Sequence, residues 1–222
     1  MPDHCFNEAA RPGLIAQPSN SWSSLGFAVV AVMVAARRPR VATAADRPAV
    51  ATTPALRVLL AFALLVTGLG SAFYHASLTF IGQTADVAGM YLLSTFVILY
   101  ARADGRADAV RRFVTAYAAF NAVLLVALIL VPELRRQLFA VLLLIGLVLE
   151  YRRGTRTPAL APRALLASAL TLAVAFAIWI ADMRHVGPSP TSWLQGHAVW
   201  HLLGALSTWQ LARYYDGRVL AD

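Results

Sequence analysis

Runs of apolar residues, each close to twenty residues long, alternate with short polar connectors along the whole chain. A helix needs about 20 apolar residues to cross the hydrocarbon core of a bilayer. The pattern therefore predicts seven membrane-spanning helices, over residues 19–36, 55–74, 84–100, 113–131, 134–150, 163–181 and 192–211. None of these segments alternates polar and apolar residues with a period of two, which argues against a membrane β-barrel.

The composition supports this assignment. Apolar residues make up 59% of the 222 residues and charged residues only 14%, with a mean hydropathy of +0.63. Soluble domains average about 45–50% apolar and about 25% charged residues, so we predict an all-α integral membrane protein with a single domain over residues 1–222. The net charge of +8 would suggest nucleic-acid binding in a soluble protein. Here we assign it to cytoplasmic loops and expect no nucleic-acid partner.

The distribution of arginine predicts the orientation. All nineteen basic residues are arginine, which we attribute to the base composition of a bacterial genome. Loops on the cytoplasmic side of membrane proteins are enriched in basic residues. An outer N-terminus places fifteen of the nineteen in the cytoplasm and leaves Arg11, Arg135, Arg136 and Arg184 outside. We therefore predict a bacterial inner-membrane protein with an outer N-terminus and a cytoplasmic C-terminus. No cleavable signal is visible, so the first helix is expected to direct insertion.

Three histidines fall in one membrane layer under this topology. The stretch "GHAVWH" at the start of the seventh segment places His197 and His201 one turn apart on one helical face. Such a pair can chelate one metal ion, and His75, near the outer end of the second segment, is the natural third ligand. The other histidines, His4 and His185, lie in the N-terminal segment and an outer loop. Three nitrogens with an open fourth position predict a catalytic zinc site.

A serine and an aspartate lie at the same predicted depth. Ser71 precedes His75 by one helical turn, and Asp86 lies near the outer start of the third segment. An ionisable residue inside a membrane segment is costly and is by default a functional candidate. Asp86 could act as a general base on a zinc-bound water, and the hydroxyl of Ser71 could stabilise an oxyanion.

Each of these residues also has a simpler explanation. A serine in a membrane helix often bonds to the carbonyl four residues earlier, and a lone histidine can simply pair with a neighbour. His197 and His201 could flank a packing interface or ligate haem. Asp182, at the end of the sixth segment, is expected to be an interfacial acid or one that supports the site. Tryptophans 179, 193, 200 and 209 are typical of interface anchors or packing aromatics. The shared depth of three histidines, an acid and a serine favours a metal site.

Two stretches together resemble one family. "GSAFYHASLTFIGQTAD" and "GHAVWH" are similar to the alkaline ceramidases of the CREST superfamily, which also includes the progestin and adiponectin receptors. The family pattern is a serine four residues before a histidine, an aspartate eleven residues after it, and a GHxxWH helix near the C-terminus. Ser71, His75, Asp86, His197 and His201 match it. The resemblance implies a seven-helix zinc amidase that cleaves the N-acyl bond of a sphingoid lipid.

The N-terminal segment matches the family less closely. Alkaline ceramidases carry an acidic segment before the first helix that is associated with calcium. Asp3, Cys5 and Glu8 echo it, whereas Phe6 directly follows the cysteine and Gln17 stands where a later acid is expected. Calcium prefers several carboxylate oxygens, so the resemblance implies a weakened calcium site at Asp3 and Glu8.

The leading hypothesis is therefore a zinc-dependent amide hydrolase, embedded among membrane lipids, that acts on a ceramide-like or other N-acyl lipid. The alternative is a seven-helix receptor or sensor with a structural zinc, and a haem or ion carrier ranks third. The sequence does not identify the acyl lipid or the oligomeric state.

Overall fold

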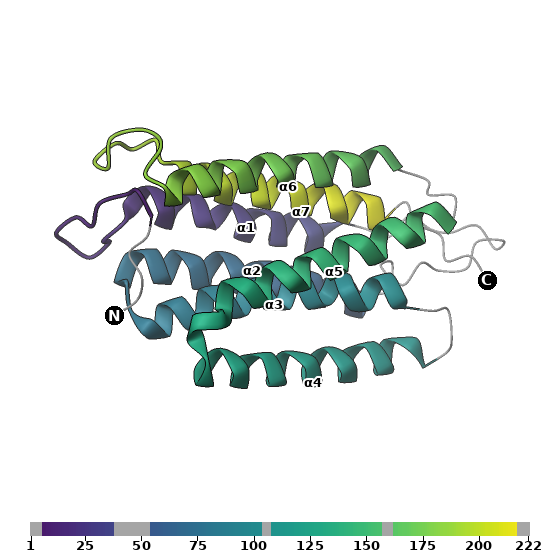
Figure 1. Ribbon diagram of the computed structural model, residues 1–222. Coiled ribbons are helices and arrows are strands. Elements are labelled where there is room, and N and C mark those ends of the chain that lie inside the picture. Colours follow the sequence, from purple (N-terminus) through teal and green to yellow (C-terminus); the bar gives the residue numbers. More distant parts are fainter. Residues whose placement is uncertain (1–5, 38–53, 104–107, 157–161, 217–222) are drawn as a thin grey trace.

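The computed structural model describes residues 6–37, 54–103, 108–156 and 162–216. Seven long helices and one short 3₁₀ helix account for most of them. In chain order they are α1 (Pro18–Ala36), α2 (Pro54–Ser77), α3 (Phe80–Arg102), α4 (Ala109–Leu130), η2 (Pro132–Leu134), α5 (Arg135–Arg156), α6 (Pro162–Met183) and α7 (Gly196–Asp216). The long helices run side by side as one bundle, with successive helices antiparallel (Figure 1), so the all-helical membrane fold predicted from the apolar pattern is confirmed.

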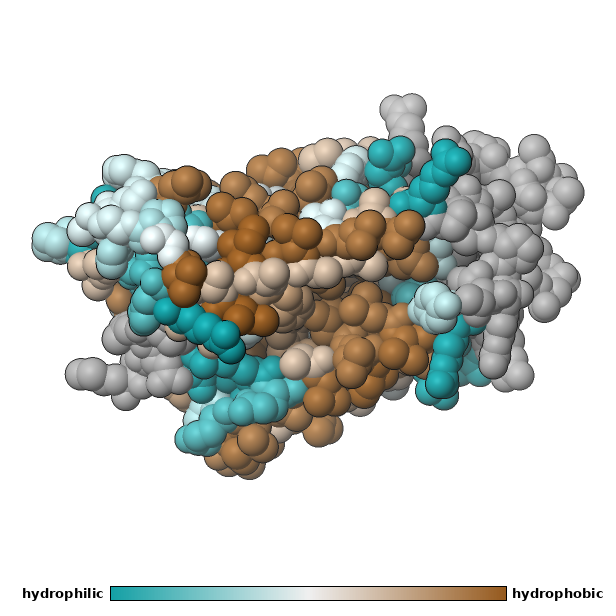
Figure 2. Space-filling view, turned by 45° about the horizontal axis from the view of Figure 1, so that its top comes forward, coloured by the Kyte–Doolittle hydropathy of each residue, from teal (hydrophilic) through white to brown (hydrophobic). Residues whose placement is uncertain are grey.

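Five of the helices are long and apolar enough to span a membrane by length and composition, namely α1, α2, α3, α4 and α6. Helices α5 and α7 carry more polar residues, including the arginines of α5 and the histidines of α7. Apolar side chains such as Val123, Ile129 and Leu170 are exposed on α4 and α6, which suits contact with lipid. Figure 2 shows an apolar belt across the middle of one face, with hydrophilic residues toward both ends.

The helices pack in a definite order of neighbours. Helix α2 packs against both α1 and α3. Helix α7 packs against α1 and α6, and α3 also packs against α4 and α5. Helices α5 and α6 therefore pack on different partners and lie at the two ends of this series. An apolar core of residues such as Phe27, Leu64 and Phe96 holds α1, α2, α3 and α7 together.

Two glycines allow α2 and α3 to approach closely. A Cβ added to Gly70 would lie 2.6 Å from the carbonyl oxygen of Ala85, and one added to Gly89 would lie 2.5 Å from Cα of Thr67. Because these distances are too short for any side-chain carbon, glycine is required at both positions. Gly70 precedes Ser71 and Ala85 precedes Asp86, so the close approach brings the two candidate catalytic residues together.

Several helix ends differ from the apolar pattern by more than three residues, and at two of them a side-chain hydrogen bond explains the difference. Helix α3 begins at Phe80 rather than 84, because the hydroxyl of Thr79 accepts a hydrogen bond from the Gly82 amide and caps the helix. Helix α7 begins at Gly196 rather than 192. The side chain of Gln195 there donates to the carbonyl of Ser192 at 2.8 Å, which stabilises a non-helical approach to the helix.

Candidate metal and catalytic centre

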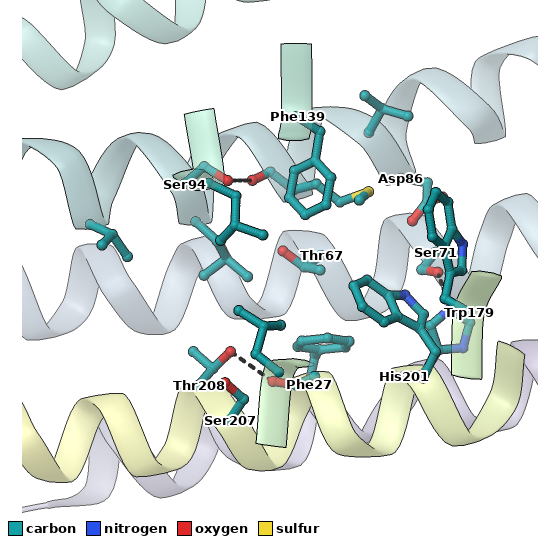
Figure 3. Close-up of a pocket in the computed structure, with 18 of the residues that line it drawn as sticks. Phe27, Thr67, Ser71, Asp86, Ser94, Phe139, Trp179, His201, Ser207 and Thr208 are labelled. Atoms are coloured by element: carbon teal, nitrogen blue, oxygen red, sulfur yellow. Dashed lines mark hydrogen bonds between the residues drawn. The ribbon is translucent and has the colours of Figure 1, made fainter. Parts of the chain in front are cut away.

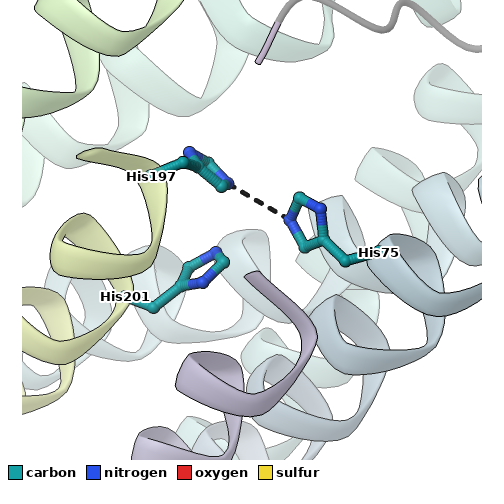
Figure 4. Close-up of side chains that lie close together, drawn as sticks. All are labelled: His75, His197 and His201. Atoms are coloured by element: carbon teal, nitrogen blue, oxygen red, sulfur yellow. Dashed lines mark hydrogen bonds between the residues drawn. The ribbon is translucent and has the colours of Figure 1, made fainter. Parts of the chain in front are cut away.

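Three histidines meet at one end of the bundle. His75 lies in the last turn of α2, and His197 and His201 lie in the first two turns of α7. All three are buried, and one nitrogen of each lies within 4.8 Å of the others. The Nε2 atoms of His75 and His197 are 3.2 Å apart (Figure 4). Among the described residues this is the one cluster of three or more His, Cys, Asp or Glu side chains that could hold a metal ion.

One distance within the cluster is compatible with zinc. Zinc–nitrogen bonds are about 2.0–2.1 Å long, so two nitrogens of a tetrahedral zinc lie about 3.3 Å apart. The distance of 3.2 Å between the Nε2 atoms of His75 and His197 is close to that value. Three neutral imidazoles are also a donor set that zinc commonly takes.

Hydrogen bonds orient two of the three rings. His75 Nδ1 lies 2.7 Å from Gln17 Oε1, so this nitrogen donates and leaves Nε2 free to bind a metal. His201 Nδ1 lies 2.9 Å from Ser23 Oγ and 3.2 Å from Ser24 Oγ. Metal-binding histidines are usually held in this way by a partner on the other ring nitrogen.

The ring of His197 is held differently. Its Nδ1 is buried and has no hydrogen-bond partner among the described residues. The ring of Phe6 stacks on it, with centroids 3.8 Å apart and an interplanar angle of 27°. The aromatic ring therefore covers this histidine on the side of the N-terminal segment.

Ser71 links the histidines to Asp86. Its hydroxyl lies 3.3 Å from His201 Nε2, accepts a hydrogen bond from Ser24 at 3.1 Å, and donates to the carboxylate of Asp86. Figure 3 shows Ser71, Asp86 and His201 facing the same cavity. The structure thus brings together all five residues predicted from the two sequence stretches.

The N-terminal segment folds over this end of the bundle. Backbone bonds join the amides of Ala16 and Gln17 to the carbonyls of Ala76 and His75, at 3.0 and 2.9 Å. The Asn7 amide donates to Asp182 Oδ2 at 3.1 Å, so the segment also reaches the end of α6. Asp182 is buried and supports this segment; its predicted role as an interfacial acid or one that supports the site stays a prediction.

Glu8 has a structural contact. Its two carboxylate oxygens accept hydrogen bonds from the amides of Ser19 and Asn20, each at 2.9 Å. These amides belong to the first turn of α1, where a negative charge is favourable. Asp3 lies outside the described residues, so calcium binding by Asp3 and Glu8 stays a prediction. His4 also lies outside them, and His185 is exposed in the loop after α6.

A long apolar cavity extends from the histidines along the inside of the bundle. Its wall includes Phe139, Leu143 and Leu147 of α5 together with Leu165 and Leu172 of α6. It reaches the buried Glu150 near the opposite end of α5 and passes the hydroxyls of Ser94, Ser207 and Thr208 (Figure 3). A cavity of this shape and lining suits an extended hydrocarbon chain.

The tryptophans divide between packing and surface positions. Trp179 and Trp200 line the cavity and pack with Phe176, with Trp200 at an edge-to-face centroid distance of 4.7 Å. Trp193 is exposed and lies under the guanidinium of Arg11 at 4.5 Å. The packing role expected for the tryptophans thus applies to Trp179 and Trp200, and also to Trp209, which packs against the apolar core.

A protein-family model described as Ceramidase matches residues 3–216, nearly the whole chain. No curated protein matches the chain.

Proposed function

The chain belongs to the ceramidase family, and from this premise we propose that it is a zinc-dependent membrane amidase that cleaves the N-acyl bond of a ceramide-like lipid. The observation that carries the proposal is the position of Ser71. Its hydroxyl bridges Asp86 and His201 beside three clustered histidines. A purely structural metal site has no need of this serine and acid.

His75, His197 and His201 would hold the ion. Zinc bound there would polarise the scissile carbonyl and lower the pKa of a bound water to about 7. Asp86 accepts a proton from the attacking water and passes it to the nitrogen of the leaving amine. The Ser71 hydroxyl donates to the negative charge that develops on the carbonyl oxygen. The apolar cavity holds the acyl chain and keeps bulk water away from the reacting bond.

The test is turnover of purified protein on a panel of N-acyl lipids, with zinc measured on the same samples. Asp86→Asn keeps the size of the side chain but cannot take the proton, so we expect turnover to fall by about 10²–10⁴. Ser71→Ala removes one donor, and we expect a fall of about 10²–10³. Both variants should keep their zinc, because neither side chain completes the three-histidine set.

Ser94→Ala is the matched control. Ser94 lines the same cavity, but its hydroxyl donates to the carbonyl of Met90 at 2.9 Å, away from the histidines. Its loss should leave turnover close to that of the wild type. Normal turnover in Asp86→Asn would refute the assigned proton transfer. Wild-type protein that binds zinc yet cleaves no amide in a broad panel would favour the receptor alternative.

A further inference from the structure

The cavity has one side-chain amide among its described lining residues, and this amide belongs to Gln83 of α3. Gln83 is buried and precedes Asp86 by three residues, which is a rise of about 4.5 Å along the helix axis. Residues at this spacing are neighbours on the surface of a helix. The amide therefore lies beside the proposed reaction centre, displaced from it toward the end of the bundle where α3 begins.

The hydrogen bonds of this amide use only part of its capacity. Gln83 Nε2 donates to the hydroxyl of Tyr74 at 3.2 Å, which ties the side chain to α2. A primary amide has two N–H donors and a carbonyl oxygen that accepts. No described residue donates to Gln83 Oε1, and this oxygen is not among the fully enclosed polar atoms of the structure. Because Gln83 lines the cavity, Oε1 is available there as an acceptor.

The other polar side chains at this end are already engaged. The proposed reaction uses Ser71 and Asp86, and the three histidines would hold the zinc. Arg135 and Arg136 also line the cavity, but each already takes part in other interactions. Gln83 is therefore the lining residue next to Asp86 whose acceptor has no task in the fold or in the proposed reaction.

The direction of the cavity decides which half of the substrate reaches Gln83. The apolar part of the cavity runs from the histidines toward Glu150, near the far end of α5. An acyl chain in that part leaves the amine half on the opposite side of the scissile bond. The amine nitrogen lies beside Asp86, which gives it a proton. A group carried two carbons beyond this nitrogen then reaches the position one turn along α3, where Gln83 lies.

We propose that Gln83 Oε1 accepts a hydrogen bond from a hydroxyl on the amine half of the substrate, so that the enzyme selects N-acyl amides of vicinal amino alcohols. This inference rests on the proposed amidase function. A hydroxyl matches the site because it is neutral and can donate to the oxygen of a neutral amide. A site that bonds a substrate hydroxyl discriminates against an analogue without it, since the polar group of the protein is then left unpaired.

The experiment compares three palmitoyl amides that differ at one group of the amine half. They are N-palmitoylethanolamine, its methyl ether, and N-propylpalmitamide, in which a methyl replaces the hydroxyl. Ceramide serves as a fourth substrate, and the full-length protein is placed in phosphatidylcholine nanodiscs. We expect the wild type to show a kcat/KM about 5- to 50-fold higher for the hydroxyl substrate than for the methyl one. The methyl ether should be as poor as the methyl substrate, because its oxygen cannot donate.

Gln83→Met replaces the amide by an unbranched apolar side chain of similar size. Its kcat/KM for the hydroxyl substrate should fall to the value for the methyl substrate, while the methyl substrate and the ether should be nearly unaffected. A loss confined to the hydroxyl substrate separates direct contact from a general distortion of the centre. Zinc content should equal that of the wild type, because Gln83 is not one of the three histidine ligands.

Gln137→Met is the matched control. It makes the same change in the first turn of α5, but Gln137 is exposed and does not line the cavity. It should leave the preference for the hydroxyl substrate intact.

Several outcomes would overturn the inference while leaving the amidase function intact. One is a wild type that cleaves the methyl substrate as well as the hydroxyl one, or that cleaves ceramide but not N-palmitoylethanolamine. Another is a Gln83→Met variant that loses the same factor on all three palmitoyl amides. A methyl ether cleaved as fast as the alcohol would show that the substrate oxygen accepts, which contradicts the role of Oε1. Failure of the wild type to cleave any of the four substrates would instead refute the amidase function, and the inference with it.

Discussion

At the residue scale, the histidines depend on partners that come from a different part of the chain. Gln17 Oε1 accepts from His75 Nδ1 at 2.7 Å, and Gln17 Nε2 donates to the Glu8 carbonyl at 2.7 Å. Gln17 is fully buried and sits at the start of α1. The orientation of the His75 ring is thus tied to the fold of the N-terminal segment.

This contact predicts how zinc affinity responds to substitution. The wild type should carry about one zinc per chain, and His197→Ala should remove most of it, because a ligand is lost. Gln17→Leu removes the acceptor without removing a ligand, so we expect zinc to bind about 10- to 100-fold more weakly. Elemental analysis gives the content, and competition with a chelator gives the affinity.

Ser77→Ala is the control for this prediction. Ser77 lies at the same end of α2, but its hydroxyl donates to the carbonyl of Phe73 at 2.8 Å, away from the cluster. Its zinc affinity should equal that of the wild type. If Gln17→Leu releases zinc at the same chelator concentration as Ser77→Ala, the glutamine does not orient the ligand.

Sequence spacing was sufficient to find the residues that share a helical face. His197 and His201 are one turn apart, as are Ser71 and His75, and helix geometry alone places each pair together. Gln17, Ser23 and Ser24 were missed as partners of the histidines. The contact of Gln17 depends on how the segment before α1 folds back onto α2, and those of Ser23 and Ser24 depend on the packing of α1 against α7. The polar run "PSNSWSS" at the start of an apolar helix was the available signal.

At the scale of elements, the contact between α2 and α3 sets the distance between Ser71 and Asp86. Gly70→Ala would place a Cβ 2.6 Å from the Ala85 carbonyl oxygen and 3.1 Å from the Asp86 nitrogen. Because both neighbours are backbone atoms, the helices must separate. We expect a loss of about 1–3 kcal/mol in stability and lower turnover, measured by thermal unfolding and lipid hydrolysis.

Gly26→Ala provides the comparison, because it is also a glycine-to-alanine change inside a helix. Its added Cβ would meet the flexible side chain of Leu202 at 3.3 Å and Cβ of Ala205 at 3.6 Å. Both variants gain the same helix propensity, about 1 kcal/mol. Equal melting temperatures for the two would show that the α2–α3 contact tolerates the extra carbon.

The apolar pattern located seven helices because the hydrophobic period and length are strong signals in membrane chains. It placed their ends less well. Thr79 caps α3 earlier than hydropathy indicates, and Gln195 delays α7. Both shifts arise from single side-chain hydrogen bonds. Hydropathy averaged over many residues does not detect such bonds.

At the scale of the whole molecule, the orientation in the membrane stays a prediction. The fifteen-to-four division of arginines indicates a cytoplasmic C-terminus. A topology reporter fused after Asp222 should therefore report the cytoplasm, and one inserted near Ser189, in the exposed loop after α6, should report the outer side. The reverse pattern would invert the orientation and place the histidines at the cytoplasmic face.

The order of neighbours in the bundle could not be read from hydropathy. Lipid-facing and buried positions are both apolar in a membrane protein, so the pattern does not say which helices touch. The packing of α5 on α3 and of α6 on α7 leaves the cavity between elements that have different partners. That arrangement came only from the structure.

The cavity between α5 and α6 also bears on the energy of substrate capture. Exposing a hydrocarbon chain to water costs about 0.8 kcal/mol per methylene. For a long acyl chain this cost would be the largest part of the free-energy barrier to entering the cavity through water. The leucines and phenylalanine that line the cavity belong to helices whose other faces carry exposed apolar side chains, which suit contact with lipid. A chain that enters between these helices moves from one apolar environment to another, so its methylene groups do not have to pass through water. For such an enzyme the quantity that governs saturation is the two-dimensional density of substrate in the bilayer, not its amount per volume of solution.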